Sequence, residues 1–301
     1  MFQFLPFQFP VLAHGISGKW RIKLDIINIR FQDIDSGTQH CEHNPMIEIK
    51  PVPAFQDNYI WMLINPDDGS TAIVDPGDAT PVLDFINKKS LKPVAILTTH
   101  HHGDHVGGVN RLLQHFDIPV YGPANENIPH RTVALREGDR VELPALSARF
   151  DILDVPGHTS GHIAYYGQGC LFIGDTLFMA GCGRLFEGTA DQMYVSLNKI
   201  RNLPDETRIY CAHEYTLANL KFALSVEPDN ADITARLKHS EALRKEHIPT
   251  VPDTLAVEKK TNPFLRTSVD SVIKAAASHA GHDLNNGTAV FAAVRKWKDG
   301  F

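Results

Sequence analysis

From Met46 onward, short apolar runs alternate with turn residues and amphipathic segments. Alternating side chains predict strands, the turn Asn65–Gly69 between two apolar runs predicts a hairpin, and helical periodicity predicts intervening helices. The predicted strands are Met46–Val52, Tyr59–Ile64, Thr71–Val74, Val94–Leu97, Pro119–Tyr121, Arg140–Leu143, Phe150–Val155, Leu171–Ile173 and Arg208–Cys211. The predicted helices are Thr80–Lys88, Val106–His115 and Asp191–Arg201. Paired strands with interspersed helices favour two sheets packed face to face, with helices outside.

The pattern changes after His213. Helical periodicity takes over, and the segments are joined by proline-containing linkers such as Pro249–Pro252. The predicted helices here are Leu217–Ser225, Ile233–Lys245, Val269–Ala277 and Thr288–Trp297. We therefore expect an α/β domain over residues 46–213 and a small all-helical domain over residues 214–301.

Residues 1–45 differ from both regions. Met1–Pro10 carries four phenylalanines but has no positively charged start and no small-residue cleavage site, so it is a poor signal peptide. Regular periodicity begins only at Met46. We expect Met46 to start the functional protein and the N-terminal extension to be dispensable.

Composition narrows the classes of function. The chain has 301 residues, 43% of them hydrophobic, which suffices for one large core or two modest ones. A net charge of −6 gives no basic field for nucleic acid, and no apolar run approaches the ~20 residues of a membrane span. Cys41, Cys170, Cys182 and Cys211 form no C-x-x-C pair and are typical of reduced thiols in a cytoplasmic protein.

The segment Thr99–His105 carries the strongest chemical signal. It places four histidines and one aspartate within six positions. Imidazole nitrogen and carboxylate oxygen are ligands that Zn²⁺, Mn²⁺ and Fe²⁺ accept. His100, His102, Asp104 and His105 offer too many donors for one ion that keeps an open position, so the pattern indicates two adjacent ions. His101 is expected to point away from them.

Further donors follow the ends of other predicted strands. His158, Asp175 and His213 each come one to four residues after such an end. Loops at strand ends converge on ligands in layered α/β folds. We therefore expect these three side chains to complete the metal centre, and Asp75 to hold the histidine loop in place without binding metal.

These donors resemble a known pattern. His100-x-His102-x-Asp104-His105, followed by His158, Asp175 and His213, resembles the metallo-β-lactamase superfamily, whose fold is an αββα sandwich, and Val74–Gly77 is similar to its upstream aspartate motif. More specific strings resemble glyoxalase II, the hydroxyacylglutathione hydrolases, over about residues 46–301. These strings are Pro53–Tyr59, Gly181–Ala190, Ala212–Thr216, Asn262–Arg266 and Arg295–Asp299.

The resemblance implies a division of the ligands. One metal ion would be held by His100, His102 and His158, and a second by Asp104, His105 and His213, with Asp175 bridging them. The family binds zinc and also accepts iron and manganese. Glutathione would be held by Arg184, Phe186, Tyr215, Arg295 and Lys298, which makes residues 214–301 a glutathione-binding domain. Phe186 departs from members that carry tyrosine at this position.

The implied reaction is thioester hydrolysis. Two divalent ions can share a hydroxide by lowering the pKa of a bound water from 15.7 towards ~7. This hydroxide, oriented by Asp104, would attack the carbonyl of S-D-lactoylglutathione. Glutathione thiolate would leave and D-lactate would form, the second step of methylglyoxal detoxification. The expected partner is the glutathione thioester, with no nucleic acid or membrane and with the protein as a monomer.

Other activities on the same scaffold stay open at this point. A lactonase, a β-lactamase or another thioesterase would share the metal loop. A mononuclear iron persulfide dioxygenase would lack the C-terminal pattern found here. In a redox di-iron scaffold, a carboxylate would replace His102. A ribonuclease is disfavoured by the acidic charge.

Overall fold

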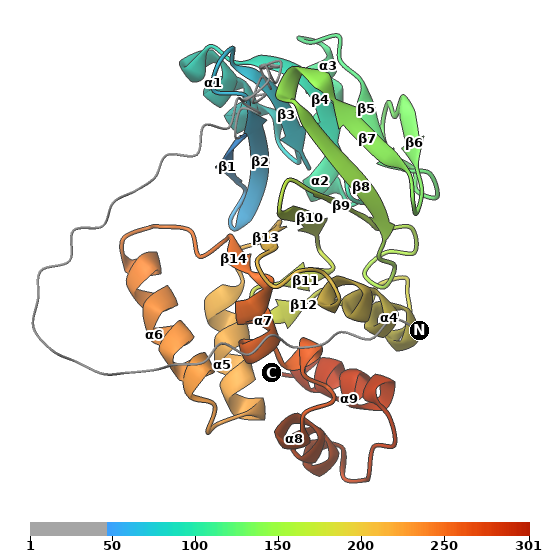
Figure 1. Ribbon diagram of the computed structural model, residues 1–301, viewed down its shortest axis with the longest axis vertical. Coiled ribbons are helices and arrows are strands. Elements are labelled where there is room, and N and C mark those ends of the chain that lie inside the picture. Colours follow the sequence, from blue (N-terminus) through green and yellow to red (C-terminus); the bar gives the residue numbers. More distant parts are fainter. Residues whose placement is uncertain (1–46) are drawn as a thin grey trace, which may run out of the picture. The chain divides into compact units, whose positions relative to one another are not determined.

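The computed structural model of the protein describes residues 47–301 (Figure 1). The predictions for residues 1–45, and for Met46 as the start of the functional protein, lie outside the described residues.

The first sheet is built from the N-terminal half of the described chain. Its strands, in spatial order, are β1 (Glu48–Ala54), β2 (Asn58–Ile64), β3 (Ser70–Val74), β4 (Lys92–Leu97), β5 (Val120–Pro123) and β6 (Val133–Leu135). β1, β2 and β3 pair antiparallel, whereas β3, β4, β5 and β6 pair parallel. The carboxyl ends of β3 and β4 therefore lie at one edge of the sheet.

The second sheet follows in the chain. Its spatial order is β14 (Asp253–Thr254), β13 (Arg208–Cys211), β10 (Cys170–Gly174), β9 (Ile163–Gly167), β8 (Ala148–Asp154) and β7 (Arg140–Leu143). β10 and β13 pair parallel, and β8 runs in the same direction because two antiparallel pairings separate it from β10. A short hairpin, β11 (Leu177–Phe178) and β12 (Gly181–Cys182), follows β10.

Helices complete the layers and the C-terminal region (Figure 1). They are α1 (Ala79–Lys89), α2 (Gly103–Val106), α3 (Val109–Leu113), α4 (Ala190–Arg201), α5 (Thr216–Val226), α6 (Ala231–Lys245), α7 (Leu255–Thr261), α8 (Asp270–Ala280) and α9 (Gly287–Asp299). The start of α4 is set locally by a capping box, in which Thr189 and Gln192 exchange side-chain to backbone hydrogen bonds.

Strand β2 shows how the layers are held together. Because successive strand side chains point to opposite faces, Tyr59 and Trp61 enter the core between the two sheets. Ile60 and Met62 enter a second core, where the first sheet packs against α1 and α3. Met193 of α4 joins the inter-sheet cluster from the far side. The predicted αββα sandwich, followed by a helical C-terminal region, is confirmed.

The helix predicted over Val106–His115 is wrong in its bounds. The structure forms α2 and then α3, separated by Gly107 and Gly108. A Cβ atom on Gly108 would lie 2.6 Å from the carbonyl oxygen of Pro76, so the loop that precedes α1 presses against this point. The backbone N–H of Gly108 donates to the same carbonyl oxygen at 2.8 Å, outside the helical hydrogen-bond pattern, so the helix is interrupted here. β6, β9, the β11–β12 hairpin, β14 and α7 have no counterpart among the predicted elements. Because β14 pairs with β13 of the second sheet, residues 214–301 are not all-helical as expected.

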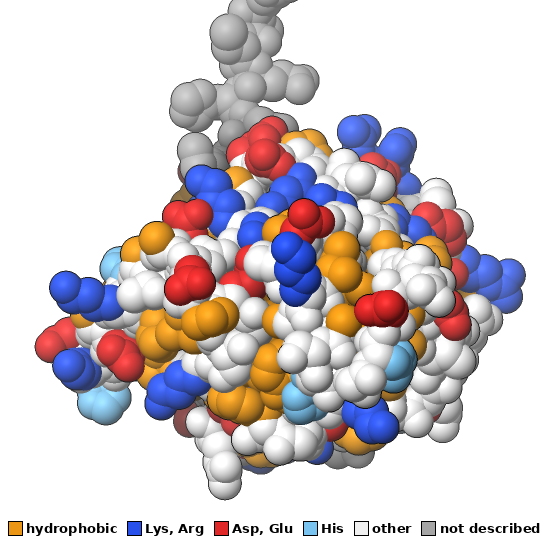
Figure 2. All heavy atoms as spheres, turned by 90° about the horizontal axis from the view of Figure 1, so that it is seen from below, with side chains coloured by type: hydrophobic (Ala, Val, Ile, Leu, Met, Phe, Trp, Pro, Cys, Tyr) orange, Lys and Arg blue, Asp and Glu red, His pale blue; other side chains and the backbone are white. Residues whose placement is uncertain are grey.

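Figure 2 views the molecule from the side on which the C-terminal helices lie. Lysine and arginine side chains are interspersed there with aspartate and glutamate and with small apolar areas. Within residues 47–301, none of the helices is both long enough and apolar enough to span a bilayer.

Candidate metal centre

The predicted metal-binding side chains meet at one edge of the sandwich. The histidine loop follows β4, His158 lies beyond β8, Asp175 follows β10 and His213 lies beyond β13. These four strands end at the same edge, so their loops converge even though the segments are far apart in sequence.

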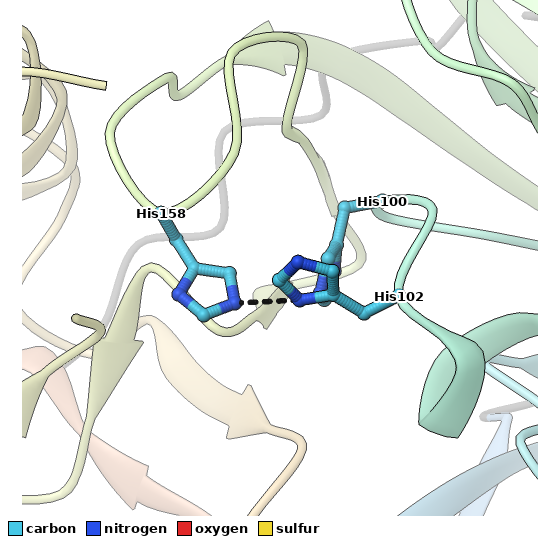
Figure 3. Close-up of side chains that lie close together, drawn as sticks. All are labelled: His100, His102 and His158. Atoms are coloured by element: carbon cyan, nitrogen blue, oxygen red, sulfur yellow. Dashed lines mark hydrogen bonds between the residues drawn. The ribbon is translucent and has the colours of Figure 1, made fainter. Parts of the chain in front are cut away.

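Three histidines form the first group. Nδ1 of His102 lies 3.1 Å from Nε2 of His100 and 3.0 Å from Nε2 of His158. Figure 3 shows the three rings, from two separate loops, pointing toward one another. Nitrogens that surround one tetrahedral zinc ion at 2.0–2.1 Å are about 3.3 Å apart. The spacing of this group therefore suits a single ion.

Asp175 lies between this group and a second one. Its Oδ2 is 3.4 Å from Nε2 of His158, whereas its Oδ1 is 3.4 Å from Nε2 of His105 and 3.3 Å from Nε2 of His213. Oδ2 of Asp104 completes the second group, 3.4 Å from Nε2 of His213. The two oxygens of Asp175 thus face different groups, as a bridging carboxylate requires.

The outer ring nitrogens of these histidines are held by hydrogen bonds. Oδ2 of Asp75 lies 3.0 Å from Nδ1 of His105, and the same carboxylate accepts hydrogen bonds from the backbone N–H and the hydroxyl of Thr99. Nδ1 of His158 faces the carbonyl oxygen of Arg184 at 2.9 Å. Such contacts leave Nε2 free to bind a cation, which is the usual arrangement around protein-bound zinc.

Two buried polar atoms of the cluster indicate whether these residues fit a metal ion. Nε2 of His105 and Oδ1 of Asp175 are buried and have no hydrogen-bond partner within residues 47–301. Buried polar atoms rarely lack a partner. A cation between these atoms would satisfy both, so the donor set is compatible with a dinuclear metal site.

The pKa shifts divide the histidines of the cluster into two sets. Burial lowers the pKa of His100, His102 and His158, which keeps their rings neutral. Burial alone would raise the pKa of Asp175, but the neighbouring His105 outweighs it and holds that pKa well below its usual range. Burial also acts on His105 and His213, but the carboxylates of Asp75, Asp104 and Asp175 outweigh it. They raise the pKa of His105 well above its usual value and that of His213 to about 10. Divalent cations bind neutral imidazoles, so these two rings must release protons when a cation binds.

The residues predicted to hold glutathione line the same cavity as the metal centre. This cavity of about 540 Å³ is bordered by His102, Asp104, His158, Asp175 and His213 and also by Arg184, Phe186, Tyr215, Arg295 and Lys298. Tyr215 stacks on His213 with 4.8 Å between ring centroids. Phe186 is 62% exposed and stands edge-on to His158, so it forms part of the rim.

The two cations of α9 have different surroundings. Arg295 is buried, and its guanidinium donates to the carbonyl oxygen of Cys182 at 2.8 Å and to Asp299 at 2.9 Å. Among the described residues, Lys298 forms no ion pair with a carboxylate, and its ammonium lies over the rings of Phe222 and Phe301. Lys298 is therefore the freer of the two to meet a substrate.

Two residues that the sequence pattern did not indicate contact the second group. Asp57 lies 2.8 Å from Nδ1 of His213, and the amide of Asn58 donates to Oδ2 of Asp104 at 3.1 Å. Both lie within Pro53–Tyr59, one of the strings that carry the family resemblance. The resemblance of that string to the family was therefore a signal that these residues matter. The spacing of residues along the chain could not show that Asp57 contacts the distant His213.

Comparisons with known proteins agree with this architecture. The model of the metallo-beta-lactamase superfamily matches residues 57–213, and that of the hydroxyacylglutathione hydrolase C-terminus matches residues 214–301. A hydroxyacylglutathione hydrolase from Nitrosomonas eutropha is 56% identical over 256 residues, which is 85% of this chain and all of that protein.

Solved structures show the same fold. ETHE1 from Myxococcus xanthus aligns with a TM-score of 0.57 at 23% identity, covering 84% of this chain and 97% of that one. TTHA1623, solved in a di-iron-bound form, aligns with a TM-score of 0.50 at 27% identity, covering 72% of this chain and 100% of that one.

Two packed sheets with a histidine–aspartate cluster at one edge define a member of the metallo-β-lactamase superfamily. The helices that follow narrow this class. The chain belongs to the hydroxyacylglutathione hydrolase family, glyoxalase II, as the resemblance in sequence predicted.

Proposed function

We propose that this chain hydrolyses S-D-lactoylglutathione to glutathione and D-lactate. One observation carries the proposal: a single cavity is lined both by the histidine–aspartate cluster and by the cationic Arg184 and Lys298. Glutathione has two carboxylates, which such cations bind. The thioester carbonyl would then reach the cluster.

Two divalent cations per chain form part of this proposal. His100, His102 and His158 would hold one, Asp104, His105 and His213 the other, and Asp175 would bridge them. Nitrogen-rich donor sets suit zinc, and iron or manganese are the alternatives. When bound, the cations supply Lewis acidity and lower the pKa of a water molecule, which yields a nucleophile near neutral pH.

Asp104 has the role of orienting that water. Its side chain is 41% exposed and borders the cavity, so it can accept a hydrogen bond there. Asn58 donates to the same carboxylate and limits its rotation. Asp75 would not contact the metal ions or the water molecule. It positions Thr99 and the proposed ligand His105 through hydrogen bonds.

The remaining residues that line the cavity position the substrate. Arg184, Lys298 and Arg295 supply positive charge for the carboxylates, while Phe186 and Tyr215 offer ring faces and edges to the peptide portion. Attack of the water-derived oxygen on the carbonyl carbon would form a carbon–oxygen bond, and collapse of the tetrahedral adduct would break the carbon–sulfur bond. The departing thiolate is a good leaving group, so no side chain has to protonate it.

We also propose a cytoplasmic, monomeric protein without nucleic-acid or membrane partners. Cys170, Cys182 and Cys211 are buried free thiols, which suits a reducing compartment. Size-exclusion chromatography with light scattering measures the molar mass in solution and so tests the monomeric state. Detection of the native protein in separated cell fractions tests the location.

A substrate series tests the activity. The metal-replete protein is assayed on S-D-lactoylglutathione, on the D-lactoyl thioester of N-acetylcysteamine, on a lactone and on a β-lactam. We expect the glutathione thioester to have the highest kcat/KM, by at least tenfold over the truncated thioester. Equal values for the two thioesters would contradict glutathione recognition, and oxygen uptake with a persulfide would indicate the dioxygenase alternative.

A further inference from the structure

A third group of metal-binding side chains lies beside the first. His101, His102 and Glu187 each place one donor atom within 4.8 Å of the others. His101 was expected to point away from the metal centre, and its ring nitrogens face Glu126 and Glu187. Neither His101 nor Glu187 has a role in the proposed hydrolysis.

The ring of His101 is oriented as metal-binding histidines are. Its Nδ1 lies 3.0 Å from Oε2 of Glu126, whose side chain is only 2% exposed. Glu126 is itself fixed, since Thr159 and the backbone N–H of Gly161 donate to its Oε1. A buried carboxylate on one ring nitrogen sets the tautomer and leaves Nε2 for a cation.

Glu187 presents one oxygen to the same point. Its Oε2 accepts a hydrogen bond from the backbone N–H of Ser160 at 2.9 Å, while its Oε1 lies 3.2 Å from Nε2 of His101. One oxygen thus anchors the side chain and the other faces the histidine. The side chains of His101 and Glu187 are 33% and 35% exposed, so the point is open to solvent.

We propose that His101, Glu187 and His102 form a third divalent-cation site at the rim of the catalytic cavity, weaker than the dinuclear centre. Two imidazole nitrogens and one carboxylate oxygen suit Zn²⁺ or Co²⁺ and do not suit Mg²⁺ or Ca²⁺, which take oxygen ligands. The negative charges of Glu126 and Glu187 offset the added positive charge.

The position of His102 gives this site a functional consequence. His102 also belongs to the first histidine group, so a cation at the rim would share its imidazole ring with the first metal ion and weaken the donation to that ion. Excess Zn²⁺ is therefore expected to inhibit hydrolysis. This inhibition rests on the proposed function, whereas binding of the third ion does not.

Equilibrium dialysis of the metal-replete protein against increasing Zn²⁺ tests the site. We expect a third zinc ion per chain to bind at least tenfold more weakly than the first two. In Glu187→Gln and His101→Asn the third ion should be lost while two ions are retained. Glu142→Gln, an exposed glutamate on β7, is the matched control and should keep all three.

Inhibition by zinc is measured on the same proteins. The inhibitory zinc concentration should rise at least tenfold in Glu187→Gln and stay unchanged in Glu142→Gln. Saturation at two ions in the unaltered protein would overturn the site, as would a third ion that survives in both variants. If S-D-lactoylglutathione is not hydrolysed but the third ion binds and depends on Glu187, only the proposed function fails.

Discussion

Oδ1 of Asp57 lies 2.8 Å from Nδ1 of His213, although the two residues are 156 positions apart in the chain. Asp57 belongs to the β1–β2 turn of the first sheet, and His213 follows β13 of the second. The backbone N–H of Tyr59 also donates to the carbonyl oxygen of Ala212 at 2.7 Å. The orientation of one proposed metal ligand therefore depends on how the two sheets are joined.

Asp57→Ala should weaken the second cation. Without the carboxylate, His213 loses the contact that fixes its ring, and we expect metal affinity to fall roughly 10–100-fold. The metal affinity of Asp57→Asn should lie between that of Asp57→Ala and that of the unaltered protein. Competition with a chromogenic chelator measures the affinity, and Asp67→Asn, at an exposed turn, is the control. Equal affinities for all four proteins would contradict the role of Asp57.

Removal of the metals should abolish turnover. His102→Ala deletes the nitrogen that lies between His100 and His158, so we expect kcat to fall by about 10³-fold or more, with less than two ions bound. A chelator should produce the same loss of kcat in the unaltered protein. Added zinc should restore kcat in the chelator-treated unaltered protein but not in His102→Ala. The test fails for the proposed centre if the variant retains both ions and normal kcat.

Lys298 and Arg295 should behave differently. Lys298→Ala should raise KM severalfold with little change in kcat or stability, because the ammonium contributes ground-state binding. Arg295→Ala should raise KM and also lower stability, since it leaves the carbonyl of Cys182 without its buried donor. Steady-state kinetics and thermal unfolding separate the two effects.

Lys296→Ala is the matched control on the same helix, because Lys296 is exposed and borders a different cavity. It should leave both KM and stability unchanged. If Lys298→Ala matches it, the C-terminal helix does not form part of the substrate pocket.

Glu227→Gln should destabilise the C-terminal region. The buried carboxylate of Glu227 accepts hydrogen bonds from Arg266 at 2.7 and 2.9 Å and from Ser271 at 2.6 Å. Loss of its charge leaves Arg266 partly buried without a counter-ion, and we expect a loss of roughly 3 kcal/mol at pH 7, measured by urea unfolding. Glu241→Gln, at an exposed position of α6, is the control.

The same pair predicts a pH dependence. Burial opposes ionisation of Glu227, but Arg266 and Ser271 outweigh it, and the folded-state pKa lies below the ordinary value of 4.5. The pair therefore stabilises the protein fully above about pH 4.5, and this contribution disappears as pH falls through the folded-state pKa. The difference between the unaltered protein and Glu227→Gln should shrink over that range. A difference independent of pH would exclude Glu227 as its source.

The sequence by itself determined the elements whose signals are local. Alternation of apolar residues marked most of the strands, and His100, His102, Asp104 and His105 needed only one short loop to indicate a metal site. The strings shared with glyoxalase II identified the family and the helical region. β6 has only three residues and β9 has no apolar–polar alternation, so neither strand has a periodic pattern of its own.

Only the tertiary structure decided relations between distant segments. It set the two oxygens of Asp175 toward different histidine groups, buried Arg295 against Cys182 and interrupted a helix at Gly107 and Gly108. Each depends on the distance between backbones that packing brings together, and residue spacing along one segment contains no measure of that distance.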